Sequence, residues 1–518
     1  MSTFTELSEQ FFASGGTGST LQGDAEAFDS VESAQLALFY RQLKFGPWIG
    51  SGPRVATVGG RRFTEPGIDH ALPLSTFPFR ALKLYPVSGD SQAGLLAAVS
   101  GLAGKTPDHA FREWSPARHS AVILARNPED LAREIAQAAI GIPRAFETNG
   151  EWKTPGGSYF TASPLGQDGV CFLYPGIGSP YPGLGADLFS LSPPLLDRFE
   201  AMTRGQAHHY LHVDEMYPHG PADEASFYRD VVMLGHCAIA TSLIYTWILR
   251  ELFQVKPRAA AGYSFGEAIM LACLGVWPDP VELAQNLDRI PTFSTRLHGP
   301  KDSIREQWGL PVGAKVEWDS WTVRTTPALA FAAIKPEKNV FLCNINTPGE
   351  VVIAGERNGC NRALERIGAS VASPVPIPVT MHCEATRGEY DNLVAIHSLT
   401  VIPEPGIDFF SSAYCRPIDF AKESPAHTTA EAYCRVADFP RLVRNIYATG
   451  PKIFLELGGR RNCCTWIEKI LKDRPHAAVP CDLKGQPSEV SILRALARLV
   501  SHGVPLQLEA LYNPYPAR

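Results

Sequence analysis

The chain lacks the features that mark several protein classes. It has 47 Lys and Arg residues against 53 Asp and Glu residues, a formal net charge of −6, so no positive excess favours nucleic acid as a partner. No uninterrupted apolar run reaches the roughly 18 residues of a membrane-spanning helix, and we expect no membrane association. The first residues show neither region of a signal peptide, and the 11 cysteines follow no disulfide spacing. These absences favour reduced thiols and a cytoplasmic location.

What the chain does contain is an ordinary globular composition, with 45% hydrophobic and 19% charged residues. Its 518 residues predict two to four packed units of roughly 150 residues each. Apolar, strand-like runs at 119–125, 169–175 and 453–459 alternate with helical patterns such as 128–140 and 230–252. This alternation predicts an α/β fold with a buried parallel sheet.

One segment has a different pattern. Between residues 325 and 377, strands are expected at 328–334, 340–345 and 350–354, and a helix at 358–367. Strands paired in hairpins against a helix favour a small ferredoxin-like subdomain.

The sequence Gly-Tyr-Ser-Phe-Gly at 262–266 places Ser264 between two glycines, just before a mostly apolar helical stretch at 267–274. Such a serine can occupy a tight strand-to-helix turn because the glycines allow the backbones to approach closely. Its hydroxyl then lies at a helix N-terminus, where free N–H groups and the helix dipole stabilise an oxyanion. The pattern predicts a nucleophilic serine; the alternative is a turn that only packs a helix onto a sheet.

A second glycine-rich loop, at 176–185, follows the apolar strand at 169–175. It has neither the Lys-Ser/Thr pair nor the dinucleotide spacing of phosphate-binding loops. Beside a nucleophile, such a loop can offer a backbone N–H group to an oxyanion.

Three histidines crowd residues 208–212, with Asp214 and Glu215 nearby. This set has no known metal-ligand spacing, so a solvated helix end is the favoured interpretation and no metal is expected. His236, within the apolar helix at 230–252, is expected to be a core histidine.

Four motifs occur in a fixed order along residues 169–475. They are Tyr-Pro-Gly-Ile-Gly-Ser at 174–179, Gly-Tyr-Ser-Phe-Gly-Glu at 262–267, Asn-Thr-Pro-Gly-Glu-Val-Val-Ile-Ala-Gly at 346–355 and Phe-Leu-Glu-Leu-Gly-Gly at 454–459. Together they resemble the F-P-G-Q-G-S, G-H-S-x-G-E, N-x-P-x-x-V-V-I-x-G and E-V-G-P-G motifs of the malonyl-CoA:acyl-carrier-protein transacylase and polyketide synthase acyltransferase family.

Four shorter stretches narrow this resemblance. They resemble the acyltransferase of polyunsaturated fatty acid synthases, the PfaB type, at 262–264, 274–277, 380–382 and 461–465. Residues 83–140 resemble the linker domain that precedes polyketide synthase acyltransferases, and 491–512 resemble the segment that follows them. No ketosynthase motif is found in residues 1–80.

The resemblance implies an α/β-hydrolase-like core with a parallel sheet, an inserted ferredoxin-like small subdomain and an N-terminal α/β linker domain. The expected ranges are an N-terminal extension of unclear role at 1–82, with an amphipathic helix at 33–44; the linker domain at 83–165; the core at 166–324 and 378–475; the subdomain at 325–377; and a C-terminal post-acyltransferase linker at 476–518.

The implied reaction moves an acyl group, malonyl or longer, from coenzyme A to an acyl carrier protein through an acyl-serine, in polyunsaturated fatty acid or polyketide biosynthesis. No cofactor is expected to be bound, since the coenzyme A thioester is the substrate and the carrier protein's phosphopantetheine is the acceptor. The expected partners are the acyl carrier protein and other synthase subunits. Two alternatives remain: an acyl-thioesterase or editing hydrolase with the same site, and a non-catalytic synthase scaffold.

The family motifs assign four residues to the chemistry. Ser264 is the expected nucleophile, and His382, which lies 118 residues later (382 − 264), is the expected base. The backbone N–H groups of Phe265 and Ile177 are the expected oxyanion hole, although the family usually carries glutamine at the second position. A core histidine bonded only to backbone is the alternative for His382.

Three further positions are expected to bind substrate or orient the base. Arg289 lies 25 residues after the serine (289 − 264), as does the arginine that binds the malonyl carboxylate in the family, but it can also pair with Asp288 at the surface. Asn346 is expected to line the pocket or to cap the turn before Pro348. Asp438 is expected to orient the histidine through its backbone or its carboxylate, or else to be an exposed loop residue.

Overall fold

The computed structural model describes residues 26–28, 54–58, 61–65, 82–218, 222–368, 372–377 and 379–512. The helix expected at 33–44 and most of the N-terminal extension lie outside these residues. Within the extension, three strands form a separate sheet: β1 (Glu26–Phe28), β2 (Arg54–Val58) and β3 (Arg61–Glu65).

The central sheet has six strands in the order β15-β14-β9-β8-β17-β18, and all but the terminal β15 run parallel. Its strands are β8 (Val170–Tyr174), β9 (Pro257–Gly262), β14 (Asp408–Ser411), β15 (Arg416–Pro417), β17 (Ile453–Glu456) and β18 (Ala477–Pro480). The predicted α/β fold with a parallel sheet is confirmed. The core extends past the expected end at residue 475, because β18 pairs with β17 and completes the sheet.

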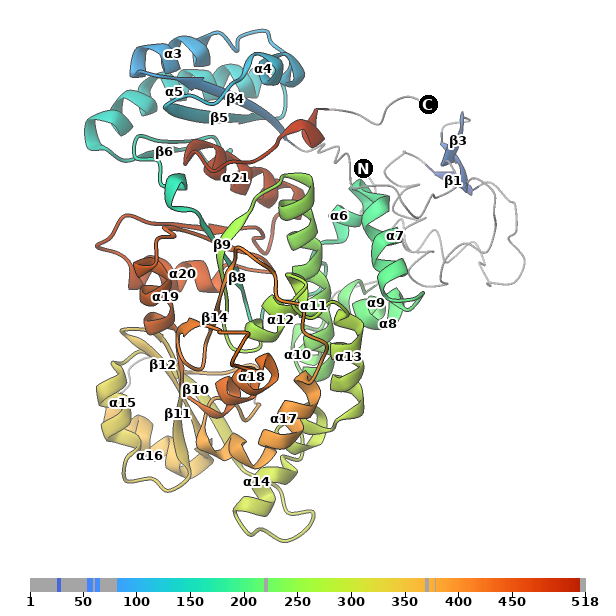
Figure 1. Ribbon diagram of the computed structural model, residues 1–518, viewed down its shortest axis with the longest axis vertical. Coiled ribbons are helices and arrows are strands. Elements are labelled where there is room, and N and C mark those ends of the chain that lie inside the picture. Colours follow the sequence, from blue (N-terminus) through green and yellow to red (C-terminus); the bar gives the residue numbers. More distant parts are fainter. Residues whose placement is uncertain are drawn as a thin grey trace.

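Helices cover both faces of this sheet (Figure 1). Along β8, Phe172 and Tyr174 belong to one apolar cluster and Cys171 and Leu173 to another, as the two-residue period of a strand requires. The first cluster includes α11 (Val231–Trp247) and α12 (Gly266–Cys273), and the second includes α19 (Phe439–Ala448) and α20 (Asn462–Ile470).

Helix α11 is continued by the π-helical turn η2 (Ile248–Leu252). The segment Val231–Leu252 is long and apolar enough to cross a membrane by length and composition, with a mean hydropathy of 1.6. The segment includes polar residues such as His236, Thr241 and Arg250, so it is not an uninterrupted apolar run. The most apolar 18-residue stretch of this segment is 94% buried inside the protein, as expected for a core helix.

The small subdomain has the element order β10-α15-β11-β12-α16-β13, and its strands are arranged β13-β10-β12-β11. This is a ferredoxin-like β-α-β-β-α-β topology. The elements are β10 (Trp318–Val323), α15 (Pro327–Ile334), β11 (Val340–Thr347), β12 (Glu350–Glu356), α16 (Arg357–Ile367) and β13 (Ala372–Pro374). A fifth strand, β16 (Ala437–Asp438), adds to β11 from the core part of the chain.

The strand expected at 328–334 is wrong, because this stretch is helix α15. Thr326 caps it by accepting from the N–H of Leu329, and Pro327 occupies its first turn, both typical helix-start features. The first strand of the subdomain is instead β10, which lies before the expected boundary at residue 325.

The N-terminal module is an antiparallel sheet, β4-β5-β7-β6, with helices packed on it. Its elements are β4 (Lys83–Gly89), α3 (Gln92–Ser100), α4 (Pro107–Glu113), β5 (His119–Ala125), α5 (Pro128–Thr148), β6 (Glu151–Lys153) and β7 (Tyr159–Thr161). The C-terminal helix α21 (Ser488–Ser501) lies between this module and the core (Figure 1). Ser501 at its end accepts a 2.8 Å hydrogen bond from the N–H of Thr161.

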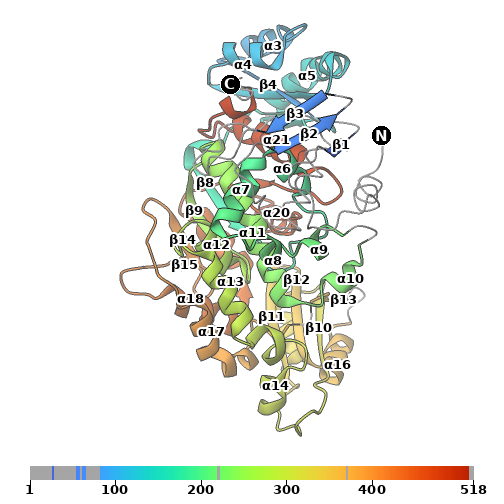
Figure 2. The same ribbon diagram turned by 90° about the vertical axis from the view of Figure 1, so that its right-hand side faces the viewer.

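The remaining helices pack around the core, and their arrangement can be followed from the side in Figure 2. They are α6 (Ala186–Leu191), α7 (Pro193–Met202), α8 (Ala207–Leu211), α9 (Val213–Met216), α10 (Glu224–Phe227), α13 (Pro280–Arg289), α14 (Asp302–Gln307), α17 (Tyr390–His397) and α18 (Pro425–Cys434), with the short helical turns η1 (Gly166–Asp168), η3 (Thr292–Arg296), η4 (Glu384–Glu389) and η5 (Glu509–Leu511).

Candidate active site

Ser264 occupies a sharp turn between β9 and α12, with a left-handed φ of 59°. The two glycines around it are required by close backbone contacts. A Cβ atom on Gly262 would lie 2.0 Å from the N atom of Glu267, and one on Gly266 would lie 2.0 Å from the carbonyl oxygen of Tyr174. The elbow therefore presses against the end of β8 and presents the serine at the start of α12.

His382 meets this serine from a distant part of the chain. Its Nε2 atom lies 2.7 Å from Oγ of Ser264. The histidine also has a left-handed φ, of 61°, and its backbone N–H donates to the carbonyl of Tyr433 at 2.6 Å. The structure thus brings together the two residues on which the sequence-based hypothesis depends.

A backbone carbonyl, and not a carboxylate, faces the other ring nitrogen of His382. Nδ1 lies 2.9 Å from the carbonyl oxygen of Ala432. Since a carbonyl can only accept, Nδ1 carries the hydrogen and Nε2 is left as the acceptor for the serine hydroxyl proton. Asp438, the expected orienting residue, has another role: its side chain caps α19 by accepting from the N–H of Arg441 at 3.0 Å.

Burial controls the protonation state of this histidine. Desolvation lowers the pKa of His382 to about 4, although the hydrogen bond to the Ala432 carbonyl opposes the shift. The imidazole is therefore neutral near pH 7, which is the form that can accept a proton from Ser264.

Glu267 connects the elbow to the helix that supplies this carbonyl. Its carboxylate is fully buried and accepts 2.6 Å hydrogen bonds from both the N–H and the hydroxyl of Ser412. The hydroxyl of Thr429, on α18, donates to it at 3.5 Å, and burial raises its pKa. Glu267 was not singled out from the sequence as a site residue, although it is the last residue of the G-x-S-x-G-E motif.

Two backbone donors stand free beside the nucleophile. Within the described residues, neither the N–H of Phe265 nor that of Ile177 donates to a protein acceptor. The loop that carries Ile177 touches the elbow, because a Cβ atom on Gly176 would lie 3.3 Å from Cβ of Ser264 and 3.7 Å from the N atom of Phe265. This arrangement fits an oxyanion hole, whose donors must be unused before the reaction.

The side chain of Asn346 has two hydrogen-bond partners. Its Oδ1 atom accepts a 2.7 Å hydrogen bond from the hydroxyl of Tyr263, and its amide nitrogen donates to Glu350 at 3.2 Å. Asn344 donates to the same tyrosine hydroxyl at 3.0 Å. Both asparagines are on β11, so this network ties the small subdomain to the residue before the nucleophile.

Among the described residues, Arg289 makes no hydrogen bond or ion pair with Ser264 or His382. It is the exposed last residue of α13, and its guanidinium donates to Oδ1 of Asn286 at 2.8 Å. The 25-residue spacing is present, but the helix ends here and Pro291 follows.

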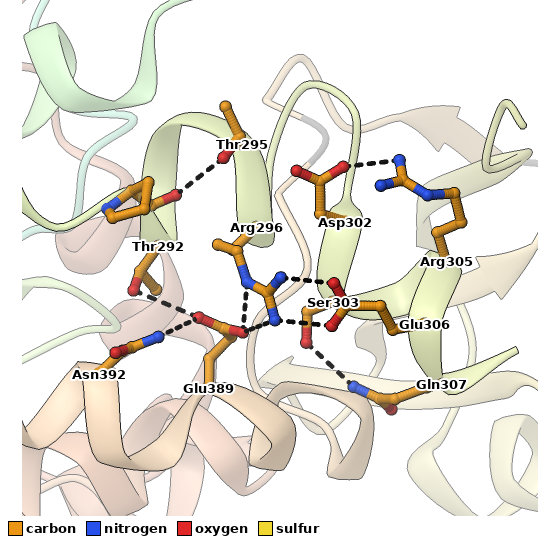
Figure 3. Close-up of polar contacts among 11 residues, drawn as sticks. Thr292, Thr295, Arg296, Asp302, Ser303, Arg305, Glu306, Gln307, Glu389 and Asn392 are labelled. Atoms are coloured by element: carbon orange, nitrogen blue, oxygen red, sulfur yellow. Dashed lines mark hydrogen bonds and ion pairs between the residues drawn. The ribbon is translucent and has the colours of Figure 1, made fainter. Parts of the chain in front are cut away.

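Another arginine lies closer in the fold to the segment that carries the base. Leu297 accepts a hydrogen bond from the N–H of Thr380, and the preceding residue, Arg296, pairs with two carboxylates (Figure 3). These are Glu389, whose side chain is fully buried, at 2.8 Å, and Glu306 at 2.7 and 2.8 Å. The positive charge of Arg296 is therefore already neutralised.

Aromatic rings line the region next to the nucleophile. The ring centroid of Phe265 lies 6.2 Å from that of Phe293 and 6.4 Å from that of Tyr433, and the latter two lie 6.1 Å apart. All three side chains are buried. They form an apolar cluster beside Ser264.

Comparison with known proteins agrees with this geometry. No protein-family model matches the chain. It is 26% identical over 413 residues to a polyunsaturated fatty acid synthase subunit of a Thraustochytrium species, and the match covers 75% of this chain but only 20% of that relative's length. It is 27% identical over 250 residues to the malonyl CoA-acyl carrier protein transacylase of Haemophilus influenzae, and this match covers 46% of this chain and 72% of that relative's length.

Solved structures share the fold at lower identity. The acyl transferase domain of SpnD has a TM-score of 0.63 at 18% identity and covers 85% of this chain and 99% of its own. A malonyl-transacylase in complex with its acyl-carrier protein has a TM-score of 0.50 at 20% identity, and this match covers 63% of this chain and 99% of the transacylase chain. In sequence the chain is similar to a polyunsaturated fatty acid synthase subunit and to malonyl CoA-acyl carrier protein transacylases, and in fold it is similar to polyketide synthase acyltransferase domains and a malonyl-transacylase.

Proposed function

We propose that the chain is an acyltransferase that moves an acyl group from coenzyme A to an acyl carrier protein through an acyl-Ser264 intermediate. The observation that carries this proposal is the 2.7 Å contact between Oγ of Ser264 and Nε2 of a neutral, buried His382. The names of the relatives support the acyl carrier protein as acceptor.

The residues have the following roles in the first half-reaction. Nε2 of His382 accepts the hydroxyl proton as Oγ of Ser264 attacks the thioester carbonyl. The negative charge that develops on that carbonyl oxygen is stabilised by the N–H groups of Phe265 and Ile177. The thiol of coenzyme A then leaves with the proton that His382 returns to its sulfur.

The second half-reaction reverses these steps with a different thiol. The phosphopantetheine thiol gives its proton to His382 and attacks the acyl-serine ester, and Ser264 regains its proton as it leaves. If water replaces the thiol, the product is a free acid, which is the thioesterase alternative. A synthase scaffold would show neither step.

The charges near the site bear on which acyl group is transferred. Arg289 is exposed and Arg296 is paired, so neither offers a free positive charge to a malonyl carboxylate. Lys301 is only 5% exposed and has no acidic partner among the described residues, and burial lowers its pKa to about 8. A longer acyl chain would pack against the Phe265, Phe293 and Tyr433 cluster, and the donor competition below tests whether a malonyl carboxylate reaches the Lys301 ammonium.

One experiment separates these possibilities. The purified chain is incubated with malonyl-CoA or a long-chain acyl-CoA, with and without an acyl carrier protein, and intact and peptide masses are measured, with Ser264→Ala as the control. We expect an adduct on Ser264 that passes to the carrier protein. Release as free acid alone would identify a hydrolase, and absence of any adduct would contradict the proposal. Repeating the donor competition with Lys301→Met tests whether this lysine selects malonyl-CoA.

A further inference from the structure

Three helices bring two histidines and an aspartate together on the far side of α11 from the sheet. The residues are His209 on α8, His236 on α11 and Asp288 on α13. One donor atom from each lies within 4.8 Å of the other two. No sequence pattern marks this set, because its members are far apart in the chain and follow no known ligand spacing.

The distances between these donor atoms are close to the distances between neighbouring ligand atoms around a metal ion. Nε2 of His209 lies 3.2 Å from one carboxylate oxygen of Asp288, and Nε2 of His236 lies 3.5 Å from the other. Ligand atoms about 2.0 to 2.1 Å from a tetrahedral Zn²⁺ ion lie about 3.3 Å from one another. All three donor atoms lie within 4.8 Å of one another, so the widest separation would have to shorten by a turn of the 53% exposed His209 side chain when an ion binds.

A further histidine contacts the other ring nitrogen of the buried ligand. Nε2 of His212 lies 3.0 Å from Nδ1 of His236. Nε2 of His236 also lies 3.1 Å from the carbonyl oxygen of Ala284, so Nε2 carries the hydrogen in the metal-free protein. A metal on Nε2 would replace this hydrogen bond and place the imidazole hydrogen on Nδ1, which would donate to His212, as the outer partners of zinc-bound histidines commonly accept such a hydrogen bond. His236 is fully buried, while the His209 and Asp288 side chains are 53% and 39% exposed, which leaves an open path for an ion.

We propose that His209, His236 and Asp288 form a binding site for a divalent transition metal, and that Zn²⁺ is the ion that this ligand set fits best. Two imidazoles and one carboxylate leave the fourth tetrahedral position to water. The site is separate from the Ser264–His382 pair, and its test does not depend on the acyltransferase activity.

A bound ion would crosslink the three helices near the nucleophile. Gly235, next to His236, is in contact with α13 and with the elbow: a Cβ atom there would lie 3.4 Å from Leu287 and 3.6 Å from the ring of Phe265. We therefore expect the metal to stabilise the fold around Phe265. It would take no part in the transfer step, because the partners of Ser264 and His382 do not include any of the three ligands.

The test measures zinc binding by the full chain, prepared without a polyhistidine tag and freed of metal by a chelator. Zn²⁺ is titrated in competition with a chromophoric chelator, and the visible absorption of Co²⁺ reports the coordination geometry. The variants are His209→Gln and Asp288→Asn, whose partly exposed side chains can be replaced without disturbing the core. His208→Gln is the matched control, since this neighbour on the same helix faces Asp214 at 3.7 Å.

We expect one equivalent of Zn²⁺, a tetrahedral Co²⁺ spectrum, and at least about a tenfold loss of affinity in each ligand variant. The control should bind as the wild type does. Zn²⁺ should also raise the unfolding temperature of the wild type and the control but not of the ligand variants. Equal affinities in the wild type and Asp288→Asn, or an equal loss in His208→Gln, would show that the three residues form a hydrogen-bonded cluster only and would overturn the proposal.

Discussion

The hydroxyl of Tyr263 donates a 2.7 Å hydrogen bond to Asn346, and this contact joins the nucleophile elbow to the first hairpin of the small subdomain. In the resembled family a histidine precedes the serine, so the tyrosine is a departure. The hydrogen bond gives this departure a structural purpose: it fixes the position of the subdomain relative to Ser264.

Replacing this tyrosine by phenylalanine should destabilise the protein. Tyr263→Phe leaves the side-chain amides of Asn344 and Asn346 without their shared partner, and both residues are buried. An unsatisfied buried polar group costs about 1 to 3 kcal/mol, so thermal unfolding should shift to a lower temperature. Tyr447→Phe is the control, because its hydroxyl donates to a backbone carbonyl at the surface and its loss should have little effect. Equal unfolding temperatures for Tyr263→Phe and the wild type would show that the contact is unimportant.

The pH dependence of acylation should reflect the buried histidine. The neutral imidazole is the base, and a pKa lowered to about 4 keeps His382 neutral down to mildly acidic pH. The rate of Ser264 acylation at pH 5.5 should therefore remain above about 90% of its value at pH 7.5, and fall only as the pH approaches 4. Single-turnover acylation checks this, with intrinsic fluorescence to verify folding at each pH. A fall to about one tenth at pH 5.5 would mean that His382 titrates as an exposed histidine does.

Asp438 should influence stability and not catalysis. Its carboxylate caps α19, and asparagine caps helices as well as aspartate does. Asp438→Asn should keep the acylation rate within about twofold of wild type, and Asp438→Ala should lose about 1 kcal/mol of stability with the same small effect on rate. A loss of tenfold or more in Asp438→Asn, with unchanged unfolding, would reveal a catalytic carboxylate that the geometry does not provide.

The sequence predicted the central part of this site because its signals are local. Glycines at 262 and 266 are required by backbone contacts within a few ångströms of Ser264, and the motif around His382 marks a position that the fold brings to it. The partner of Nδ1 could not be predicted, since any residue can supply a backbone carbonyl and nothing in the side chain of Ala432 marks it. The strand expected at 328–334 failed for a different reason: seven consecutive apolar residues were interpreted as a buried strand, although Thr326 and Pro327 mark a helix start.

The proposed metal ligands carry no signal in the sequence for a similar reason. His209 and His236 come from different helices, and Asp288 from a third, so only the packing of α8, α11 and α13 brings them together. The role of Arg289 could not be predicted from spacing alone either. Twenty-five residues separate it from Ser264 (289 − 264), but the direction of a side chain at the end of a helix depends on where that helix stops.

The variant Arg289→Ala tests directly whether this side chain binds a malonyl carboxylate. If Arg289 bound a malonyl carboxylate, its loss would remove a charge-assisted hydrogen-bond pair and cost about 1.5 to 3 kcal/mol, or roughly ten- to 150-fold in kcat/KM for malonyl-CoA. Because the guanidinium is exposed and donates to Asn286, we expect the ratio of kcat/KM for malonyl-CoA to that for butyryl-CoA to stay within about twofold of wild type. Measuring both donors on one preparation cancels any difference in folded fraction. A selective loss of malonyl-CoA activity would mean that α13 rearranges when substrate binds and delivers this arginine to the site.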